Sequence, residues 1–126
     1  MNTIAYFEIQ SSQPEREVHF YSKVFGWTIV KEDGLPIEYY RIITTGIPGA
    51  ILARPSSVPG PNQGTNAFTC SVEVADFDAC ARIILENGGQ IALPKFAVPG
   101  RCWQGYFLDT DHNVFGIFEV DENAGA

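Results

Sequence analysis

The stretch GYFLDTDHNVFGIFE, residues 105–119, decides the fold. An apolar run that ends at Leu108 leads into a polar segment, residues 109–113, and a second apolar run follows over residues 114–118. Two apolar runs joined by a short segment rich in Asp and Asn are typical of two strands and a tight turn. Gly116 interrupts the second strand, where a glycine lowers stability unless the space beside it is needed. We interpret Gly116 either as room for a ligand or as a point where strands pack closely.

Composition and charge limit the class of protein. The 126 residues, 45% of them hydrophobic, suit one domain with its own core. No apolar run approaches the roughly 20 residues that span a membrane, and the N-terminus lacks the basic segment of a signal peptide. Three cysteines without metal-like spacing indicate reduced thiols, so we expect a cytoplasmic protein. A net charge of −7 with scattered basic residues argues against nucleic acid and anionic membranes as partners, and leaves a small molecule or another protein.

The first half of the chain predicts a strand, a helix and three more strands. Residues 4–10 alternate between apolar and polar side chains, as a half-buried strand does. A helix is expected from Pro14, which suits a first turn, to Gly26, which suits the residue after a last turn. Further strands are predicted over residues 27–30, 38–45 and 50–54, and residues 55–66, with three Pro and two Gly, form a linker.

The second half repeats this order. A strand over residues 67–74 precedes Asp76, a favourable N-cap, and a helix closed by Gly88 and Gly89. Strands are predicted over residues 90–93, 101–109 and 113–120, with a loop over residues 97–100. Aligning Gly26 with Gly89 lays Tyr6 on Thr69. We therefore predict a single α+β domain of two βαβββ modules, at about residues 1–55 and 67–120, whose partly open, barrel-like sheet surrounds a concave cavity.

Several short motifs, taken in order, resemble a known superfamily. They are residues 7–9 (FEI), 14–16 (PER), 20–21 (FY), 24–27 (VFGW), 74–76 (VAD), 88–89 (GG) and 109–113 (DTDHN). This order is similar to that of the vicinal oxygen chelate superfamily, which includes glyoxalase I, bleomycin- and fosfomycin-resistance proteins and extradiol dioxygenases. The resemblance covers nearly the whole chain. It implies the paired βαβββ fold and a homodimer.

The resemblance also implies where a metal would bind. Metal-using members place His, Gln or Glu at positions on three strands, and these match Tyr6, Thr69 (or Ala67, if the register slips by one pair) and Gly116 here. None of these side chains is a usual ligand for a divalent metal. We therefore expect no metal cofactor, and a metal-independent small-molecule-binding protein.

Two alternatives remain open. The chain could be a metal-dependent lyase, isomerase or dioxygenase with relocated ligands such as Glu8 and Glu73. It could also be a dimeric interaction module whose cavity is filled by its own side chains. Whether the protein is an enzyme is left undecided, and Glu8 is the one candidate for a catalytic residue, as a general base.

The predicted pocket combines polar and aromatic side chains, and the negative charge of the chain suits a cationic ligand. Tyr6 is interpreted as a hydrogen-bond donor to the ligand or as a plug of the cavity. Glu8 is interpreted as a carboxylate for the ligand or as the partner of Arg41 or Arg54. Aromatic core packing is the alternative for the three large aromatic residues of the set. The predicted ligand-binding residues are Tyr6, Glu8, Thr69, Ser71, Trp103, Phe107 and Phe118.

Both histidines receive structural roles. His19 is expected to be exposed on the first helix. His112 lies in the segment 109–113, at a turn position where the superfamily that the chain resembles usually has Gly, and His tolerates a left-handed backbone better than most residues do. We therefore predict that residues 109–113 form a structural turn without catalytic function.

Overall fold

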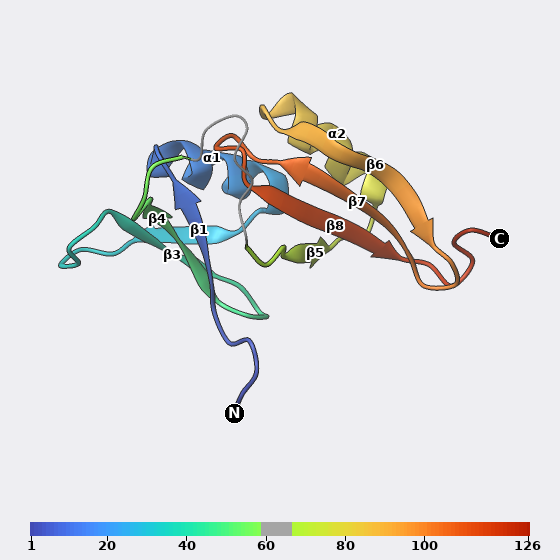
Figure 1. Ribbon diagram of the computed structural model, residues 1–126, viewed down its shortest axis with the longest axis horizontal. Coiled ribbons are helices and arrows are strands. Elements are labelled where there is room, and N and C mark those ends of the chain that lie inside the picture. Colours follow the sequence, from blue (N-terminus) through green and yellow to red (C-terminus); the bar gives the residue numbers. More distant parts are fainter. Residues whose placement is uncertain (59–66) are drawn as a thin grey trace. The chain divides into compact units, whose positions relative to one another are not determined.

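Two compact units, Met1–Thr65 and Asn66–Ala126, make up the chain and are described separately. The structure is a computed structural model that describes residues 1–58 and 67–126. In each unit a strand, a helix and three strands follow one another (Figure 1). The protein therefore has the α+β class and the two βαβββ modules that the sequence predicts. Most of the predicted linker lies outside the described residues.

The first unit is a four-stranded sheet with one helix. Its elements are β1 (Phe7–Ser11), α1 (Pro14–Phe25), β2 (Thr28–Lys31), β3 (Tyr39–Ile43) and β4 (Gly49–Ala53). The strand order is β1-β4-β3-β2, with β1 and β4 parallel and the other pairs antiparallel. Helix α1 contacts each of the four strands, so it covers one face of this sheet. We call the opposite face the first open face.

The second unit repeats this architecture. Its elements are β5 (Ser71–Glu73), α2 (Phe77–Glu86), β6 (Gln90–Val98), β7 (Cys102–Leu108) and β8 (Val114–Val120). The strand order is β5-β8-β7-β6, with β5 and β8 parallel and the other pairs antiparallel. Helix α2 packs against β6 and β8, and we call the face turned away from it the second open face. Neither sheet closes into a barrel.

Three predicted strand boundaries differ from the structure by three residues or more. Strand β1 begins at Phe7, not at residue 4, and β5 is shorter than the predicted strand over residues 67–74 because its ladder with β8 extends only over Ser71–Glu73. Strand β6 continues to Val98, through part of the predicted loop, because it pairs with β7 as far as Cys102.

The helix ends follow the predicted capping chemistry. Pro14 opens α1, and Gly26 closes it with a φ of 68° while its N–H donates to the Ser22 carbonyl. Asp76 caps α2 by accepting a hydrogen bond of 3.0 Å from the Ala79 N–H. Glu119 of β8 adds a second acceptor, 2.7 Å from the Phe77 N–H. Neither helix in the described part of the chain is long and apolar enough to cross a membrane.

Each unit has its own core between helix and sheet. Phe20 and Tyr21 of α1 pack toward Ile42 and Ile51 of the first sheet, and all four side chains are buried. The second core is likewise apolar. Its buried side chains are Phe77, Cys80, Ile84, Phe107, Phe115 and Ile117.

A buried carboxylate ties α1 to the end of β1. Glu17 is fully buried and accepts hydrogen bonds from the Ser11 hydroxyl and, at 2.9 Å, from the Arg16 Nε. The Ser11 oxygen in turn accepts from the Gln13 N–H at 2.9 Å. Because a buried charge is tolerated only when it is paired and hydrogen-bonded, these contacts fix the entry into the helix.

Strand β6 forms one edge of the second sheet. It is the longest strand, and its register against β7 shifts between Ile91 and Leu93 and again between Leu93 and Phe96. Pro94 lies within the second of these irregularities, and Lys95 follows it.

Candidate functional site

Three polar side chains are joined by hydrogen bonds on the first open face. Tyr6 precedes β1, and Glu8 points to the same side because alternate residues of a strand share a face. The pairing of Gln10 with Leu52, and of Leu52 with Tyr39, brings Tyr39 of β3 to this side as well. The two tyrosine hydroxyls are 2.7 Å apart, and the Tyr39 hydroxyl donates to Glu8 Oε2 at 3.2 Å.

Tyr39 is the residue of this group that the sequence did not indicate. Burial raises its pKa above the ordinary value, and the hydrogen bonds to Tyr6 and Glu8 add to the increase. Its hydroxyl therefore stays protonated at neutral pH. The alternation of residues 38–45 could have placed Tyr39 on one face of a strand, but not beside Tyr6, because β3 reaches β1 only through β4.

Glu8 has a different partner from the arginines that the sequence suggested. Arg41 pairs with Glu32, with 3.4 Å between Nε and Oε2. Arg54 donates to the Gln10 side chain at 3.4 Å. Glu8 instead accepts from Tyr39, so its carboxylate remains on an exposed surface beside two phenol rings.

The second open face is mixed, with aromatic rings around a small polar group. The strand register places Ser71, Gly116 and Tyr106 in one row, and Phe118 and Gln104 in the next. The Gln104 side-chain amide donates to the Ser71 hydroxyl at 3.2 Å. Phe96 completes the second row and stacks on Tyr106, with ring centroids 6.3 Å apart.

Gly116 is the point on which these side chains converge. A Cβ atom at this position would collide with the Ser71 Oγ, would lie 2.7 Å from the Gln104 Nε2 and would lie 3.1 Å from a Tyr106 ring carbon. Of the two interpretations of Gly116, the geometry favours close packing, because neighbouring side chains already fill the space beside its Cα.

Two predicted pocket residues lie on the other face of the second sheet. Phe107 is 2% exposed and packs on Phe77 and Phe115, so core packing accounts for it. Trp103 shares this face by strand alternation; its Nε1 donates to Asp121 at 3.0 Å, and Lys95 lies 4.8 Å above its ring. Neither residue can line a pocket on the open face, so we correct their assignment.

The other predicted residues of the second unit are exposed or half-exposed. Ser71 and Phe118 lie on the second open face, as described above. Thr69 is exposed and lies before β5, outside the ladder. The sequence did not predict Gln104, Tyr106 and Phe96. Which residues of β7 share a face with a given residue of β8 depends on the hairpin register, and the sequence does not determine that register.

The Asp-rich segment between β7 and β8 is a structural turn. Asp109 is buried and accepts from the N–H groups of Asp111 and Asn113 and from the Asn113 side chain, at 2.8 to 2.9 Å. His112 has a φ of 61°, in the left-handed region. The predicted turn and its left-handed His112 are therefore present, and His19 is exposed as expected.

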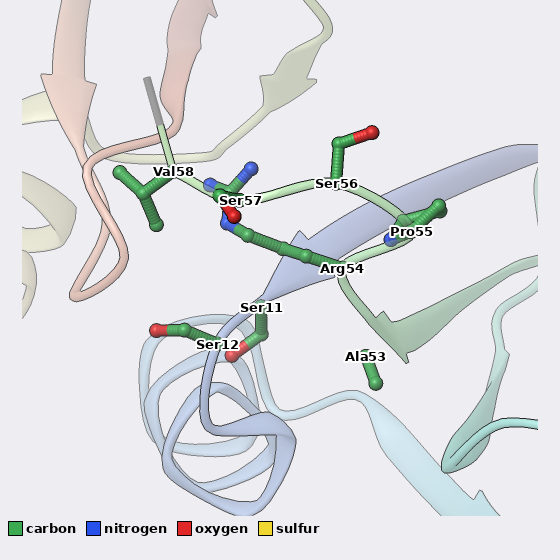
Figure 2. Close-up of a pocket in the computed structure, with 8 residues that line it drawn as sticks. All are labelled: Ser11, Ser12, Ala53, Arg54, Pro55, Ser56, Ser57 and Val58. Atoms are coloured by element: carbon green, nitrogen blue, oxygen red, sulfur yellow. The ribbon is translucent and has the colours of Figure 1, made fainter. Parts of the chain in front are cut away.

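An open hollow of about 360 Å³ lies at the carboxyl ends of β1 and β4. Figure 2 shows the side chains around it, which are Ser11, Ser12, Ala53, Arg54, Pro55, Ser56, Ser57 and Val58. Hydroxyl groups and a guanidinium could attract an anion, but Glu15 and Glu17 in the first turn of α1 oppose one. None of the predicted site residues lines this hollow, and we assign it no function.

Comparison with known proteins identifies the family. The family model described as the Glyoxalase/Bleomycin resistance protein/Dioxygenase superfamily matches residues 3–117. The chain belongs to this superfamily. The resemblance that the short motifs indicate is therefore confirmed, whereas no curated protein matches the sequence.

Solved structures share the fold of this superfamily member. A glyoxalase/bleomycin resistance protein/dioxygenase family enzyme from Burkholderia phytofirmans is 19% identical, with a TM-score of 0.76 over 93% of this chain and 98% of that one. The fosfomycin resistance protein FosX from Listeria monocytogenes is 13% identical, with a TM-score of 0.72 over 96% and 95%. TioX from a Micromonospora species is 16% identical, with a TM-score of 0.69 over 95% and 100%.

The residues at the superfamily's metal positions do not fit a divalent ion. The hydroxyl of Tyr6 is bonded to Tyr39, Thr69 offers only a neutral hydroxyl, and Gly116 offers no donor and no space for one. Within residues 1–58 and 67–126, no group of three or more His, Cys, Asp or Glu side chains could hold a metal. Glu8 and Glu73, the relocated ligands considered from the sequence, each lie on the sheet of a different unit.

Proposed function

We propose that this superfamily member is a metal-independent small-molecule-binding protein. The observation that carries the proposal is the filled space at Gly116, where Ser71, Gln104 and Tyr106 meet instead of a metal-binding carboxylate. A ligand site needs apolar surface with a few polar groups, and both open faces offer such a combination.

The chemistry of the two faces supports a cationic ligand with a flat apolar part. The chain carries a net charge of −7, and Glu8 is exposed on the first open face. Aromatic side chains dominate the second open face, where Phe96, Tyr106 and Phe118 can stack on a planar group. We also expect a homodimer, which light scattering of the purified protein would test.

Two measurements on the purified full-length protein test this proposal. Elemental analysis is expected to find no stoichiometric Zn, Ni, Mn or Fe, and adding these metals should leave the melting temperature unchanged. Calorimetry against a library of cationic and aromatic compounds should find binders that retain their affinity in a chelator.

A stoichiometric metal would contradict the proposal. Glu86→Gln is the control, because it makes the same charge change on the surface of α2. If the metal were lost in Glu8→Gln or Glu73→Gln but kept in Glu86→Gln, the metal-dependent enzyme with relocated ligands would become the better hypothesis. If no compound of the library binds, the dimeric interaction module becomes the better hypothesis for the function.

A further inference from the structure

The hydrogen-bonded chain Tyr6–Tyr39–Glu8 on the first open face has a fixed direction, and this direction selects a ligand. We propose that these three residues form an acceptor site for an organic cation that carries N–H groups, such as a primary ammonium. The inference rests on the proposed small-molecule-binding function and specifies the ligand chemistry of one face.

The direction follows from counting protons. An ionised carboxylate accepts hydrogen bonds and donates none, so the bond between Tyr39 and Glu8 uses the single hydroxyl proton of Tyr39. The 2.7 Å bond between the two phenols must then use the proton of Tyr6. Tyr6 therefore cannot donate to a ligand, which argues against one of the two interpretations of Tyr6 made from the sequence.

The hydrogen-bonding groups that the chain Tyr6–Tyr39–Glu8 leaves free for a ligand are all acceptors. The Tyr6 oxygen keeps lone pairs, and Glu8 keeps its second oxygen, Oε1. A ligand that meets this group must supply hydrogen-bond donors, so carboxylates and phosphates are excluded. The charge of Glu8 favours a cationic donor over a neutral one, because a hydrogen bond between charged groups is about twice as strong.

The surroundings leave this negative charge available to a ligand. Arg41 is held by Glu32, and Arg54 is directed to Gln10. Tyr6 is 44% exposed, so the face of its ring can meet the same cation. Donor contacts to the Tyr6 and Glu8 oxygens and a ring contact can thus act on one ligand group.

Tyr39 acts as a positioning residue in this arrangement. It touches both partners and holds the Tyr6 proton away from the ligand side. Replacing Tyr39 by Phe would release that proton, so that Tyr6 could donate as well as accept. The preference for donor ligands should then weaken although no ligand-contacting group has been removed.

The test is a titration of the full-length protein followed by amide NMR. The probes are benzylammonium, benzyltrimethylammonium and benzoate, which share a ring but differ in N–H donors and charge. Benzylammonium should shift the amides of Tyr6, Glu8 and Tyr39, with a Kd roughly tenfold below that of the quaternary ion, since one charge-assisted hydrogen bond contributes about that factor. Benzoate should shift none of them.

Variants separate the contributions of the three residues. Tyr6→Phe should weaken benzylammonium about tenfold and leave the quaternary ion nearly unchanged, whereas Glu8→Gln should weaken both cations. Tyr39→Phe should reduce the ratio between the two cations. Glu86→Gln, which makes the same charge change on α2, should alter neither Kd by more than about twofold.

The inference is overturned if the wild type binds the two cations equally, if it binds neither, or if Tyr6→Phe leaves their ratio intact. If library ligands still bind the metal-free protein at other residues, the proposed function holds although this inference fails. A stoichiometric metal would instead remove the proposed function, so the two failures can be distinguished.

Discussion

Gly116 shows how one residue can determine the packing of a whole sheet face. The absence of a side chain there lets Ser71 and Gln104 hydrogen-bond to each other across the second open face. The resemblance to the superfamily implies a metal-binding carboxylate at this position, and here neighbouring side chains occupy the space instead. The glycine within β8 is therefore a packing requirement of this particular surface.

We predict that Gly116→Ala lowers the free energy of unfolding by about 1–3 kcal/mol, because the new methyl group collides with the Ser71 hydroxyl. Chemical denaturation measures the change. Gly46→Ala is the matched control, since the nearest atom to a Cβ there is 3.9 Å away, and it should cost about 0.5 kcal/mol or less.

The second-site variant Ser71→Gly sharpens this test. It removes the colliding hydroxyl and should restore part of the stability lost in Gly116→Ala. If Gly116→Ala costs no more than the Gly46 control, close packing does not explain the glycine.

At the scale of elements, the turn between β7 and β8 depends on one buried carboxylate. Asp109 satisfies two backbone N–H groups and the Asn113 side chain, so it closes the turn that sets the hairpin register. This register in turn decides which residues of β7 reach the second open face.

We predict that Asp109→Ala lowers the free energy of unfolding by about 2–4 kcal/mol, because it leaves buried donors without a partner. Thermal or chemical unfolding would show the loss. His112→Gly changes the same turn without removing a hydrogen bond and should be neutral or stabilising, since a φ of 61° suits glycine. Equal losses in both variants would contradict the assigned role of Asp109.

The same hairpin shows what sequence patterns can predict. The turn, the left-handed His112 and the strands on either side follow from local chemistry, which the residues themselves carry. The side on which Phe107 lies follows from its pairing with Phe115, a contact set by the register. Local alternation identified Phe107 as a strand residue but could not choose between the core and the open face.

Tyr39 illustrates a second limit of prediction from the sequence. Its contacts with Tyr6 and Glu8 depend on β1 inserting beside β4, so that residues more than thirty positions apart share one surface. Tyr6 could be predicted from the superfamily resemblance, and Glu8 because strand alternation places it on the same face as Tyr6. Their partner could not, since strand order is a property of the assembled sheet.

At the scale of the whole molecule, three protonated groups make stability dependent on alkaline pH. Burial, together with the nearby Asp76, raises the pKa of Cys80 from its ordinary value of 9.0 to about 11. Burial and a hydrogen bond to Glu38 raise the pKa of Tyr40 from 10.0 to about 12. The pKa of Tyr39 is raised as well, first by burial and then by its hydrogen bonds.

Each of these groups binds its proton more tightly in the folded chain than in the unfolded one. Their contribution to stability is therefore complete below about pH 9 and is lost as pH rises through the folded pKa values, from 9.0 to about 11 for Cys80 and from 10.0 to about 12 for Tyr40. We predict a free energy of unfolding that falls between about pH 9 and about pH 12, measured by denaturant titration.

Replacing these groups should make the free energy of unfolding depend less steeply on pH. Cys80→Ala and Tyr40→Phe should each flatten the decline, even if they lower stability at neutral pH. Cys70→Ala serves as the control, because Cys70 is exposed, and it should leave the slope unchanged. A slope that is the same in all variants would show that other groups cause the alkaline loss.

The outer strand β6 has a consequence for the behaviour of many molecules together. A sheet edge with free backbone groups can recruit the edge of another copy and grow into a fibril. Pro94 lacks an N–H to offer such a copy, Lys95 adds charge, and the register shifts make the strand an irregular template. We therefore expect the same irregularities that interrupt the ladder with β7 to hinder the addition of a second copy to this edge.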